Sequence, residues 1–426
     1  MNFAEAVAEL DSRHADRIVP DLDRITKLME VLDEPQLTYP TIHVTGTNGK
    51  TTTSRLATSL ACAHNLTTGL YTSPHLVSVT ERISACGEPI PPIEFAQDYA
   101  RLHPFLQAVD AISEETVSYF EVLTALAFLW FADKPVGLAV VEVGMGGRWD
   151  ATNVVAGDVA IITPIALDHP ELGPTIADKA GEKGDIIKEG KVAVVREQPP
   201  EALAIIQARA EAVGATLLLE DRDFGIEDRV RAVGGQVISV RGLHATYEDV
   251  MLTLWGPHAA HNAAAAIVAL EAQFGRALDE DALRESFGST TSPGRMEVVG
   301  RHPLVMFDGA HNPAGAAALA DALEDSFTWE RLILVTAVSG DKDLDGLMAP
   351  LASLAGTAIA TTYSGGRAAD PERVAEACRG AGILDVETAP SVEAAMDRAR
   401  SLAGEGDLIL VTGSLYTVAD ARLALG

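Results

Sequence analysis

Residues 41–53 read TIHVTGTNGKTTT, an apolar, β-branched run followed by a glycine-rich turn and three threonines. The first part predicts a buried strand over 41–46 and the last part opens a predicted helix over 50–65. A glycine-rich turn between a strand and a helix exposes backbone N–H groups and the helix N-terminus, which favours anions. The stretch therefore predicts a phosphate-binding turn in an α/β fold, with Lys50 as a point charge and Thr51 as a hydroxyl able to reach Mg²⁺.

The spacing differs from the common G-x-x-x-x-G-K-[ST] pattern, because Gly46 and Gly49 are only three residues apart. An ordinary tight turn with a solvated lysine is the alternative. Glu142 adds weight to the phosphate hypothesis, since it follows the apolar run GLAVV and precedes the glycine-rich GMGGR. A nucleotide site that uses Mg²⁺ needs a carboxylate at a neighbouring strand end, so Glu142 is predicted to bind the metal.

Composition and charge bound the function. The chain has 426 residues and a net charge of −29, from 61 acidic and 32 basic side chains. This length favours two domains, and the negative field disfavours nucleic acid and anionic membranes as partners. An anionic substrate would require lysines and arginines to be gathered at the site.

The three cysteines, Cys62, Cys86 and Cys378, are sparse and lack metal-ligand spacing. They predict reduced thiols in a cytoplasm rather than a disulfide framework or a zinc site. The N-terminal stretch 1–17 is acidic and has no apolar signal core, and no run approaches the length of a membrane span. A cytoplasmic location is therefore predicted.

Strands and helices alternate along most of the chain, which predicts α/β layers around mostly parallel sheets. Buried strands are expected at 137–143 and 158–165, a small antiparallel sheet within 229–254, and a helix over 258–274. The breakers in TTSPGRMEVV (290–299) indicate a linker. We therefore predict two domains, 1–293 and 294–426, and the second contains four strand candidates typical of a Rossmann-like sheet, at 304–308, 331–337, 357–362 and 407–413.

Eleven short motifs occur in an order that resembles the folylpolyglutamate synthase and dihydrofolate synthase family, within the larger group of Mur ligases. The resemblance covers nearly the whole chain and is highly specific in its joint order. The motifs are GTNGKT (46–51), SPHL (73–76), ERI (81–83), SYFE (118–121), EVGMGGRWDATN (142–153), LDH (167–169), EKGDIIK (182–188), HAAHNAA (258–264), GRMEVV (294–299), DGAHNPAG (308–315) and GDLILVTGS (406–414).

The resemblance implies a P-loop-containing, Mur-ligase-like central domain with a mostly parallel sheet and a small antiparallel sheet, followed by a Rossmann-like C-terminal domain. It also implies a reaction in which ATP phosphorylates a substrate carboxylate and the amine of L-glutamate attacks the acyl phosphate. Catalysis of that kind rests on charge neutralisation and alignment. By the same resemblance we expect a monomer that adds glutamate both to dihydropteroate and to the γ-carboxylate of reduced folates.

The resemblance assigns roles to residues of the first domain. One Mg²⁺ is expected on Thr51 and Glu142, and a second on Ser73, Glu142 and His169, although imidazole is an unusual ligand for so hard a cation. Lys183 is expected to be catalytic as a carbamylated lysine, with Lys179 as a rival, and a carbamate requires an amine of lowered pKa. His169 as a helix-capping or core histidine is the structural alternative. The nucleotide is expected on Gly46, Thr47, Asn48, Gly49, Lys50, Thr51 and Thr52, with Lys50 also catalytic.

Further nucleotide contacts are implied from two later motifs. Arg295 is expected at the phosphates, Asp308 and His311 near the ribose and phosphates with His311 catalytic, and Asn262 on the adenine side. The alternatives are a linker salt bridge for Arg295, a strand-end cap for Asp308 and a helix-surface position for Asn262. Ala259 stands where the family commonly has glutamine.

The substrate pocket is expected to involve Ser73, Arg82, Phe120 and Arg148. Phe120 and its neighbour Tyr119 could stack on a pterin, because flat aromatic rings favour aromatic neighbours. Both lie in a strongly apolar predicted helix, so a core position is the alternative for Phe120. The predicted cationic site that would draw an anionic substrate to this acidic protein consists of Lys50, Arg82, Arg148, Lys183 and Arg295.

Two other functions fit parts of the sequence. GTNGKTTT also suits a ligase that joins an amino acid to a UDP-linked muramyl substrate, whereas SPHL, ERI, GRWDATN and DGAHNPAG favour folate. A nucleotide-dependent switch is the other alternative. Switches usually carry a guanine-reading N-K-x-D or T-K-x-D motif, which this sequence lacks.

Overall fold

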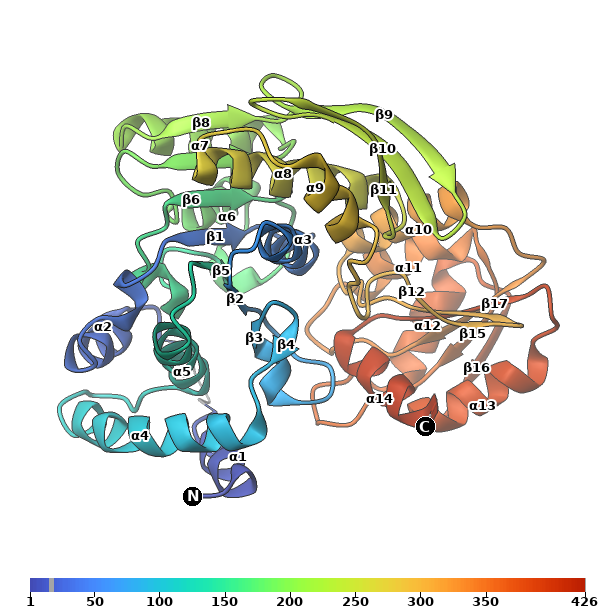
Figure 1. The fold of residues 1–426 in the computed structure, drawn as a ribbon. Coiled ribbons are helices and arrows are strands. Elements are labelled where there is room, and N and C mark those ends of the chain that lie inside the picture. The colour runs from blue at the N-terminus through green and yellow to red at the C-terminus, as the bar shows by residue number, and fades with distance from the viewer. Residues whose placement is uncertain (15–18, 426) are drawn as a thin grey trace. The chain divides into compact units, whose positions relative to one another are not determined.

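The fold was obtained as a computed structural model that describes residues 1–14 and 19–425 (Figure 1). Residues 15–18, which fall in the acidic N-terminal stretch, and residue 426 lie outside the described residues. The chain divides into two compact units. Unit 1 comprises residues 1–230, 237–252 and 261–290, and unit 2 comprises residues 231–236, 253–260 and 291–426. The predicted domain boundary between 293 and 294 stays a prediction.

Unit 1 is built on an eight-stranded sheet of order β4-β3-β2-β5-β1-β6-β7-β8. Six of these strands run parallel, whereas β3 pairs antiparallel with both β2 and β4. The strands are β1 (Thr41–Thr45), β2 (Thr68–Tyr71), β3 (Ile83–Ala85), β4 (Glu88–Pro89), β5 (Leu138–Glu142), β6 (Val159–Ile162), β7 (Val192–Val195) and β8 (Thr216–Leu219).

The strand order sets the place of the phosphate-binding turn. Strand β1 lies between β5 and β6, and every residue of β1 and β5 is buried, which is why both read as apolar, β-branched runs. The chain leaves β1 for β2 on the far side of β5, and β6 lies on the other side of β1. The carboxyl end of β1 is therefore a topological switch point, where open α/β sheets bind ligands.

Helices cover this sheet and extend beyond it. The α-helices of the first 290 residues are α1 (Phe3–Asp11), α2 (Asp23–Val31), α3 (Lys50–Ala63), α4 (Pro92–Asp110), α5 (Tyr119–Asp133), α6 (Ile176–Gly184), α7 (Pro200–Ala212), α8 (Pro257–Phe274) and α9 (Glu280–Phe287). Short 3₁₀ turns are η1 (Pro35–Leu37), η2 (Val79–Arg82), η3 (Ala151–Val154) and η4 (Pro170–Leu172).

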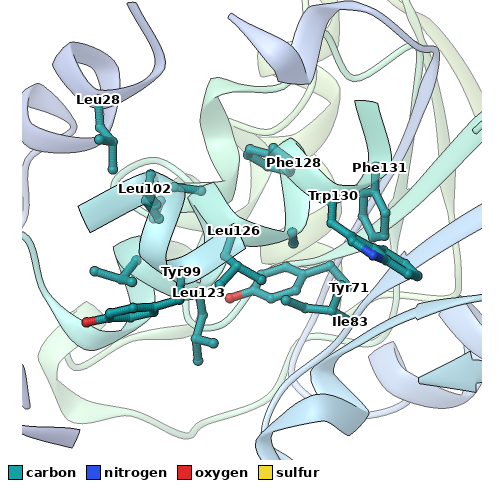
Figure 2. Close-up of a cluster of buried hydrophobic side chains, with 14 of the residues drawn as sticks. Leu28, Tyr71, Ile83, Tyr99, Leu102, Leu123, Leu126, Phe128, Trp130 and Phe131 are labelled. Carbon is teal, nitrogen blue, oxygen red and sulfur yellow. The ribbon is translucent and has the colours of Figure 1, made fainter. Parts of the chain in front are cut away.

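Helix α5 is apolar around its whole circumference, which is the pattern of a buried helix. Eleven of its fifteen residues are buried. Figure 2 shows its Leu123, Leu126, Phe128 and Phe131 gathered with side chains from α4 and the sheet into one cluster. Ser118 begins the helix by capping the Glu121 N–H, and the Glu121 carboxylate caps Ser118 in return. The SYFE motif is thus first of all a helix start.

The small antiparallel sheet predicted within 229–254 is confirmed. It has the order β11-β10-β9, with β9 (Gly225–Ala232), β10 (Gly235–Arg241) and β11 (Thr246–Leu252). The predicted alanine-rich helix is α8, whose alanines at 263–266 are completely buried.

Unit 2 contains a six-stranded sheet of order β12-β13-β17-β14-β15-β16, parallel except for β12. The four predicted strands are β13 (Leu304–Phe307), β14 (Leu332–Thr336), β15 (Ala355–Ala360) and β17 (Leu408–Thr412). The other two, β12 (Glu297–Arg301) and β16 (Asp385–Thr388), were missed because they are polar edge strands. Its helices are α10 (Pro313–Ser326), α11 (Leu344–Ala352), α12 (Pro371–Ala381), α13 (Val392–Leu402) and α14 (Leu415–Leu425).

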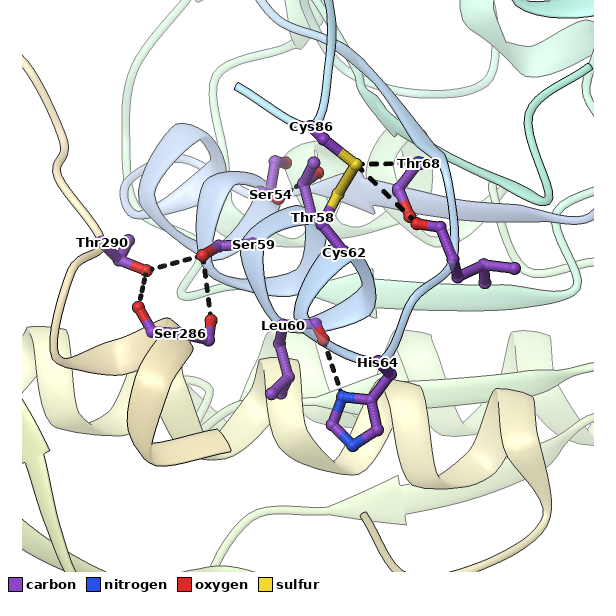
Figure 3. The surroundings of a disulfide bond; sticks show 11 residues. Ser54, Thr58, Ser59, Leu60, Cys62, His64, Thr68, Cys86, Ser286 and Thr290 are labelled. Carbon is purple, nitrogen blue, oxygen red and sulfur yellow. Dashed lines mark hydrogen bonds between the residues drawn. A yellow bond between two sulfur atoms is a disulfide. The ribbon is translucent and has the colours of Figure 1, made fainter. Parts of the chain in front are cut away.

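The expectation of three reduced thiols is wrong in this structure. Cys62 and Cys86 form a disulfide (Figure 3). Cys378 is a buried free thiol. Cys62 lies in the last turn of α3, and Cys86 lies in the turn between β3 and β4. The antiparallel pairing of β2 with β3 brings the two Cα atoms to 5.7 Å across 24 residues of sequence. Sparse cysteines did not reveal this pair because sheet pairing, not spacing, makes them neighbours.

Within residues 1–14 and 19–425, none of the helices combines the length and the apolar character that a membrane span requires.

Candidate functional site

The glycine-rich turn joins β1 to α3 in a conformation that its glycines make possible. Gly46 has φ +146°, and Gly49, which precedes the helix, has φ +91°. A Cβ on Gly46 would lie 1.8 Å from Thr163 Oγ1, on the segment after the neighbouring strand β6. Backbone atoms of the turn therefore approach that segment more closely than any side chain allows, and Thr47 N donates to Pro164 O at 3.0 Å.

Two lysines meet at the turn. Lys50 Nζ lies 3.2 Å from Gly46 O and 3.3 Å from Thr47 O. Lys183, on α6, donates from Nζ to the same Gly46 O at 2.7 Å and is buried. Burial, and next the charge of Lys50, lower the pKa of Lys183 well below its usual range. Two members of the predicted cationic site are thus brought together at one carbonyl.

Thr51 and Glu142 also meet. The parallel register places Glu142 opposite Val44, one strand over from the turn, and Thr51 Oγ1 donates to Glu142 Oε1 at 2.8 Å. Glu142 is 1% exposed. A hydroxyl and a carboxylate are hard oxygen donors of the kind that Mg²⁺ prefers, so this pair fits the predicted metal.

Ser73 and His169 stand on the same edge of the sheet. Ser73 follows β2, which runs parallel to β5, and His169 follows β6 by seven residues. The His169 imidazole makes no capping hydrogen bond to η4 and its side chain is 39% exposed, so neither a capping nor a core role describes it. Its carbonyl accepts from Lys179 Nζ at 2.7 Å. The metal-binding roles of Ser73 and His169 remain predictions.

The rival Lys179 differs from Lys183 in its surroundings. Burial lowers the pKa of Lys179 as well, but the nearby carboxylates of Asp168, Asp178 and Glu171 act in the opposite direction. Its Nζ donates to the carbonyls of His169 and Gly173, which ties the loop before α6 to that helix. Lys179 therefore has a structural task, while Lys183 faces the turn.

The loop that contains SPHL and ERI is organised by one carboxylate. Glu81 accepts hydrogen bonds from the backbone N–H groups of Leu76, Val77 and Ser78 at 2.7–2.9 Å. The next residue, Arg82, is 9% exposed and donates from Nε to His75 Nδ1 at 2.9 Å. Burial and the charge of Arg82 lower the pKa of His75 to about 4, so this imidazole accepts as a neutral ring.

The aromatic residues at the start of α5 lie beside this loop. The guanidinium of Arg82 is 5.5 Å from the ring centre of Tyr119, which also stacks on His14 at 4.1 Å. Phe120 is half-buried and packs against the apolar cluster of unit 1. A Cβ on Gly144 would lie 2.6 Å from Phe120 Cζ, so Phe120 contacts both the core and the glycine-rich loop after Glu142.

Arg148 is engaged by acids of its own unit. Its Nε contacts Asp185, and its Nη1 lies 3.5 Å from Glu182. The hydrogen bond that Arg148 donates to the Asp185 carboxylate raises the pKa of Arg148 above its ordinary value. The structure thus gives Arg148 two local partners on and beside α6, and its predicted substrate role remains a prediction.

Asn262, on α8, is buried at 1% exposure, so the helix-surface alternative is wrong. A Cβ on Gly49 would lie 2.9 Å from Asn262 Oδ1 and 3.2 Å from its Nδ2. The carboxamide therefore abuts the phosphate-binding turn itself. Thr52 is buried in the first turn of α3, next to Thr51.

In unit 2 the predicted residues cluster at the carboxyl end of β13. Asp308 is 8% exposed and accepts from Met296 N at 2.9 Å and from Ala310 N at 2.8 Å. Burial raises the pKa of Asp308, although the charge of Arg295 and the two backbone hydrogen bonds oppose it. A Cβ on Gly309 would lie 2.4 Å from Arg295 Nη1, and His311 Nδ1 is 2.9 Å from Gly309 O. Asp308 thus has the capping role given as its alternative.

Several residues that hold the site were missed from the sequence. Asp150 accepts from Met145 N, Thr152 N and Thr152 Oγ1, which fixes the loop after Glu142. Glu81 likewise accepts backbone N–H groups in its own loop, whereas the Thr163 hydroxyl donates to Thr45 O at 3.2 Å and links β1 to the segment after β6. Asp150 and Glu81 lie inside quoted motifs, so motif membership was an available signal, whereas Thr163 had none.

The chain resembles known proteins over most of its length. The family model described as Mur ligase middle domain matches residues 44–270, and that described as Mur ligase, glutamate ligase domain matches residues 294–415. The chain is 43% identical over 450 residues to the dihydrofolate synthase/folylpolyglutamate synthase of Mycobacterium tuberculosis, covering 98% of this chain and 92% of that protein.

Solved structures agree. Mycobacterium tuberculosis folylpolyglutamate synthase complexed with ADP has a TM-score of 0.96 at 43% identity, covering 100% of this chain and 98% of that chain. Escherichia coli FolC in complex with DHPP and ADP has a TM-score of 0.90 at 31% identity, with coverage of 100% and 98%. The predicted fold class, a Mur-ligase-like α/β protein with a small antiparallel sheet and a Rossmann-like C-terminal domain, is confirmed.

Proposed function

We propose that this chain, which belongs to the Mur ligase family and within it to the dihydrofolate synthases/folylpolyglutamate synthases, joins L-glutamate to a pteroate or folate carboxylate at the expense of ATP. One observation carries the proposal. A glycine-rich turn at a sheet switch point has two lysines on one carbonyl and a threonine–glutamate pair beside it. That arrangement suits the triphosphate of a nucleotide.

The chemistry proceeds in two steps. A substrate carboxylate oxygen bonds to the γ-phosphorus of ATP as the bond from that phosphorus to the β–γ bridging oxygen breaks, which gives an acyl phosphate and ADP. The neutral amine of glutamate then attacks the acyl carbon, phosphate leaves, and the amine loses a proton. Lys50 and the backbone N–H groups of the turn stabilise the charge on the transferred phosphoryl group.

Thr51 and Glu142 are the residues that would hold Mg²⁺ beside the turn, with Ser73 and His169 as proposed ligands of a second ion. The ion would neutralise phosphate charge and orient the γ-phosphoryl group. The burial of Glu142 supports this role, because a buried carboxylate needs a cation or hydrogen-bond donors close by.

Lys183 is proposed as the site of carbamylation. Carbamylation needs a neutral amine, and burial beside Lys50 favours the neutral form of Lys183. Nuclear magnetic resonance of protein equilibrated with ¹³C-bicarbonate should give a carbamate signal. The signal should persist in Lys179→Arg and vanish in Lys183→Arg, and the opposite result would move the assignment to Lys179.

The remaining roles follow the family. Arg295, Asp308 and His311 are proposed to contact the nucleotide, with His311 catalytic, and Asn262 to lie on its adenine side. Arg82, Ser73, Phe120 and Arg148 are proposed to contact the pterin or the substrate carboxylate. The burial of Arg82 next to Tyr119 supports a fixed cation beside an aromatic ring.

The activity is tested by incubating purified protein with ATP, Mg²⁺ and radiolabelled glutamate. The acceptors are dihydropteroate, a reduced folate and a UDP-muramyl peptide precursor, each alone. Labelled product with either of the first two, accompanied by ADP release that requires glutamate, supports the proposal. Product with the muramyl acceptor alone favours the other ligase function, and full ATP hydrolysis without glutamate favours a switch.

We propose that both glutamate-adding activities are present, that the enzyme is a monomer, and that it works in the cytoplasm, where ATP is made. Inactivity on dihydropteroate would remove the first activity.

A further inference from the structure

A buried ion pair lies outside all the motifs that resemble the family. Arg196 follows β7 and Glu220 follows β8, and parallel pairing of these strands brings the two residues to the same sheet edge. Arg196 Nε lies 3.2 Å from Glu220 Oε2, and the side chains are only 8% and 1% exposed. Burying such a pair costs desolvation free energy that its mutual attraction rarely recovers in full. Fold stability alone therefore does not explain its presence.

Both oxygens of the Glu220 carboxylate have partners. Oε2 also accepts from Glu197 N at 2.8 Å, and Oε1 lies 2.7 Å from His261 Nδ1. Burial acts to raise the pKa of Glu220, but the hydrogen bond from His261 and the charge of Arg196 outweigh it, so the net direction is downward. Glu220 is thus held as a carboxylate that fixes the position of the guanidinium.

Arg196 connects Glu220 to the phosphate-binding turn through Asn262. Its Nη1 donates to Asn262 Oδ1 at 2.7 Å, and the same carboxamide abuts Gly49. A guanidinium can only donate, so it fixes which end of the carboxamide is the oxygen. With Oδ1 engaged by Arg196, the other end of the Asn262 side chain presents N–H donors.

We propose that Arg196 and Glu220 are positioning residues for the nucleotide. They hold the Asn262 carboxamide in one orientation against Gly49, and thereby keep the left-handed turn before α3 in its phosphate-binding conformation. Neither residue touches the nucleotide. The inference rests on the proposed function, since it assumes that the turn binds ATP.

The test measures ADP affinity by isothermal titration calorimetry with Mg²⁺ present. The double variant Arg196→Met/Glu220→Gln removes both charges, which avoids leaving one charge buried without its partner. We expect about a tenfold weaker affinity for ADP in this variant and in Asn262→Ala. All three residues act through the contact between Asn262 and Gly49. The triple variant that combines Arg196→Met/Glu220→Gln with Asn262→Ala should therefore bind ADP about as weakly as the more affected of the two parent variants. Independent effects would instead multiply to a loss of about a hundredfold.

A matched control separates positioning from stability. Arg24 and Glu121 form another buried pair in unit 1, at 3.1 Å with 10% and 6% exposed side chains. Arg24→Met/Glu121→Gln should lower the melting temperature to a similar extent while leaving ADP affinity unchanged. A folded Arg196→Met/Glu220→Gln protein that binds ADP like the wild type, or strictly multiplicative losses in the combined variant, would overturn the inference.

Two further measurements keep the test decisive. Arg196→Lys keeps the charge but cannot make both hydrogen bonds in the same geometry, so it should raise the KM for ATP several-fold with a smaller change in kcat. An unchanged KM in this variant would also overturn the inference. Wild-type protein that fails to bind ADP would instead defeat the proposed function, which is a different outcome.

Discussion

The two units shape their candidate site loops in different ways. In unit 1, the turn at 46–51 takes its form from missing side chains, because Gly46 and Gly49 have positive φ and sit against Thr163 and Asn262. In unit 2, the loop after β13 takes its form from an added carboxylate. Asp308 accepts two backbone N–H groups, and Asn312 caps α10 by accepting from Gly315 N.

The two loops differ in which of their groups can contact a ligand. A turn built on glycine brings the cations Lys50 and Lys183 to its carbonyls at the start of a helix, which suits a multiply charged phosphate. A loop built on a buried carboxylate uses its amides internally and presents side chains such as Arg295 and His311. We infer that the first loop is made for phosphate oxygens and the second for positioning side chains.

The largest expected effect comes from filling the space that unit 1 leaves empty. In Gly46→Ala the new Cβ would meet buried Thr163 at 1.8 Å and would force a positive φ on alanine. ADP affinity and ligase turnover should both fall by about a thousandfold or more. Gly380→Ala, in α12 with open space around the Cβ, is the control and should bind and turn over normally. Near-normal ADP binding by Gly46→Ala would contradict the inference that the turn requires glycine at position 46.

The next largest effect should come from removing the cation of each loop, and the loss of kcat should be greater for Lys50 in unit 1 than for Arg295 in unit 2. Lys50→Ala removes the charge at the turn and should lower kcat by about a hundredfold to a thousandfold, because the transferred phosphoryl group loses a fixed cation. Arg295→Ala, in unit 2, should have a smaller effect on kcat. Glutamate-dependent release of ADP measures both. The comparison fails if Arg295→Ala is the more damaging change while both proteins remain folded.

The buried carboxylate of Asp308 in unit 2 should contribute to fold stability in addition to its proposed nucleotide contact. In Asp308→Asn the amide nitrogen would face a backbone N–H donor, so one of the two hydrogen bonds to Met296 and Ala310 is lost. The free energy of unfolding should fall by roughly 2 kcal/mol, measured by urea denaturation. Asp343→Asn is the control, because asparagine caps a helix as well as aspartate does. An equal loss in both variants would show that the Asp308 loop has no special dependence on its charge.

The smallest expected effect is a pH dependence of the free energy of unfolding, caused by His43 in the strand that leads into the turn. His43 in β1 is fully buried, and burial lowers its pKa from 6.5 to about 3. The unfolded chain therefore binds more protons than the folded one between these values, so stability is present above pH 6.5 and is lost as the pH falls. From pH 7.5 to pH 6 this amounts to roughly 1 kcal/mol. In His43→Asn the unfolding free energy should change less over that interval, and an unchanged slope would exclude His43 as its source.

Much of the site could be predicted because it lies in short local patterns. The strand, turn and helix over 41–63 follow from residue types in sequence order, as does the position of Glu142 at a strand end. The helix over 257–274 and the antiparallel strands were predictable for the same reason. Edge strands β12 and β16 were not, because a strand with a solvated face and polar ends lacks an apolar run.

The sequence by itself determined an α/β ligase fold with a phosphate-binding turn, since glycines, lysine and apolar periodicity act over a few residues. Only the tertiary structure decided that Lys183 shares a carbonyl with Lys50, that Asn262 abuts Gly49, and that Cys62 meets Cys86. These pairs lie 24 to 213 residues apart in the sequence, so no local pattern links them. Strand order and helix packing bring them together, and they set the pKa of Lys183 and the orientation of the Asn262 amide.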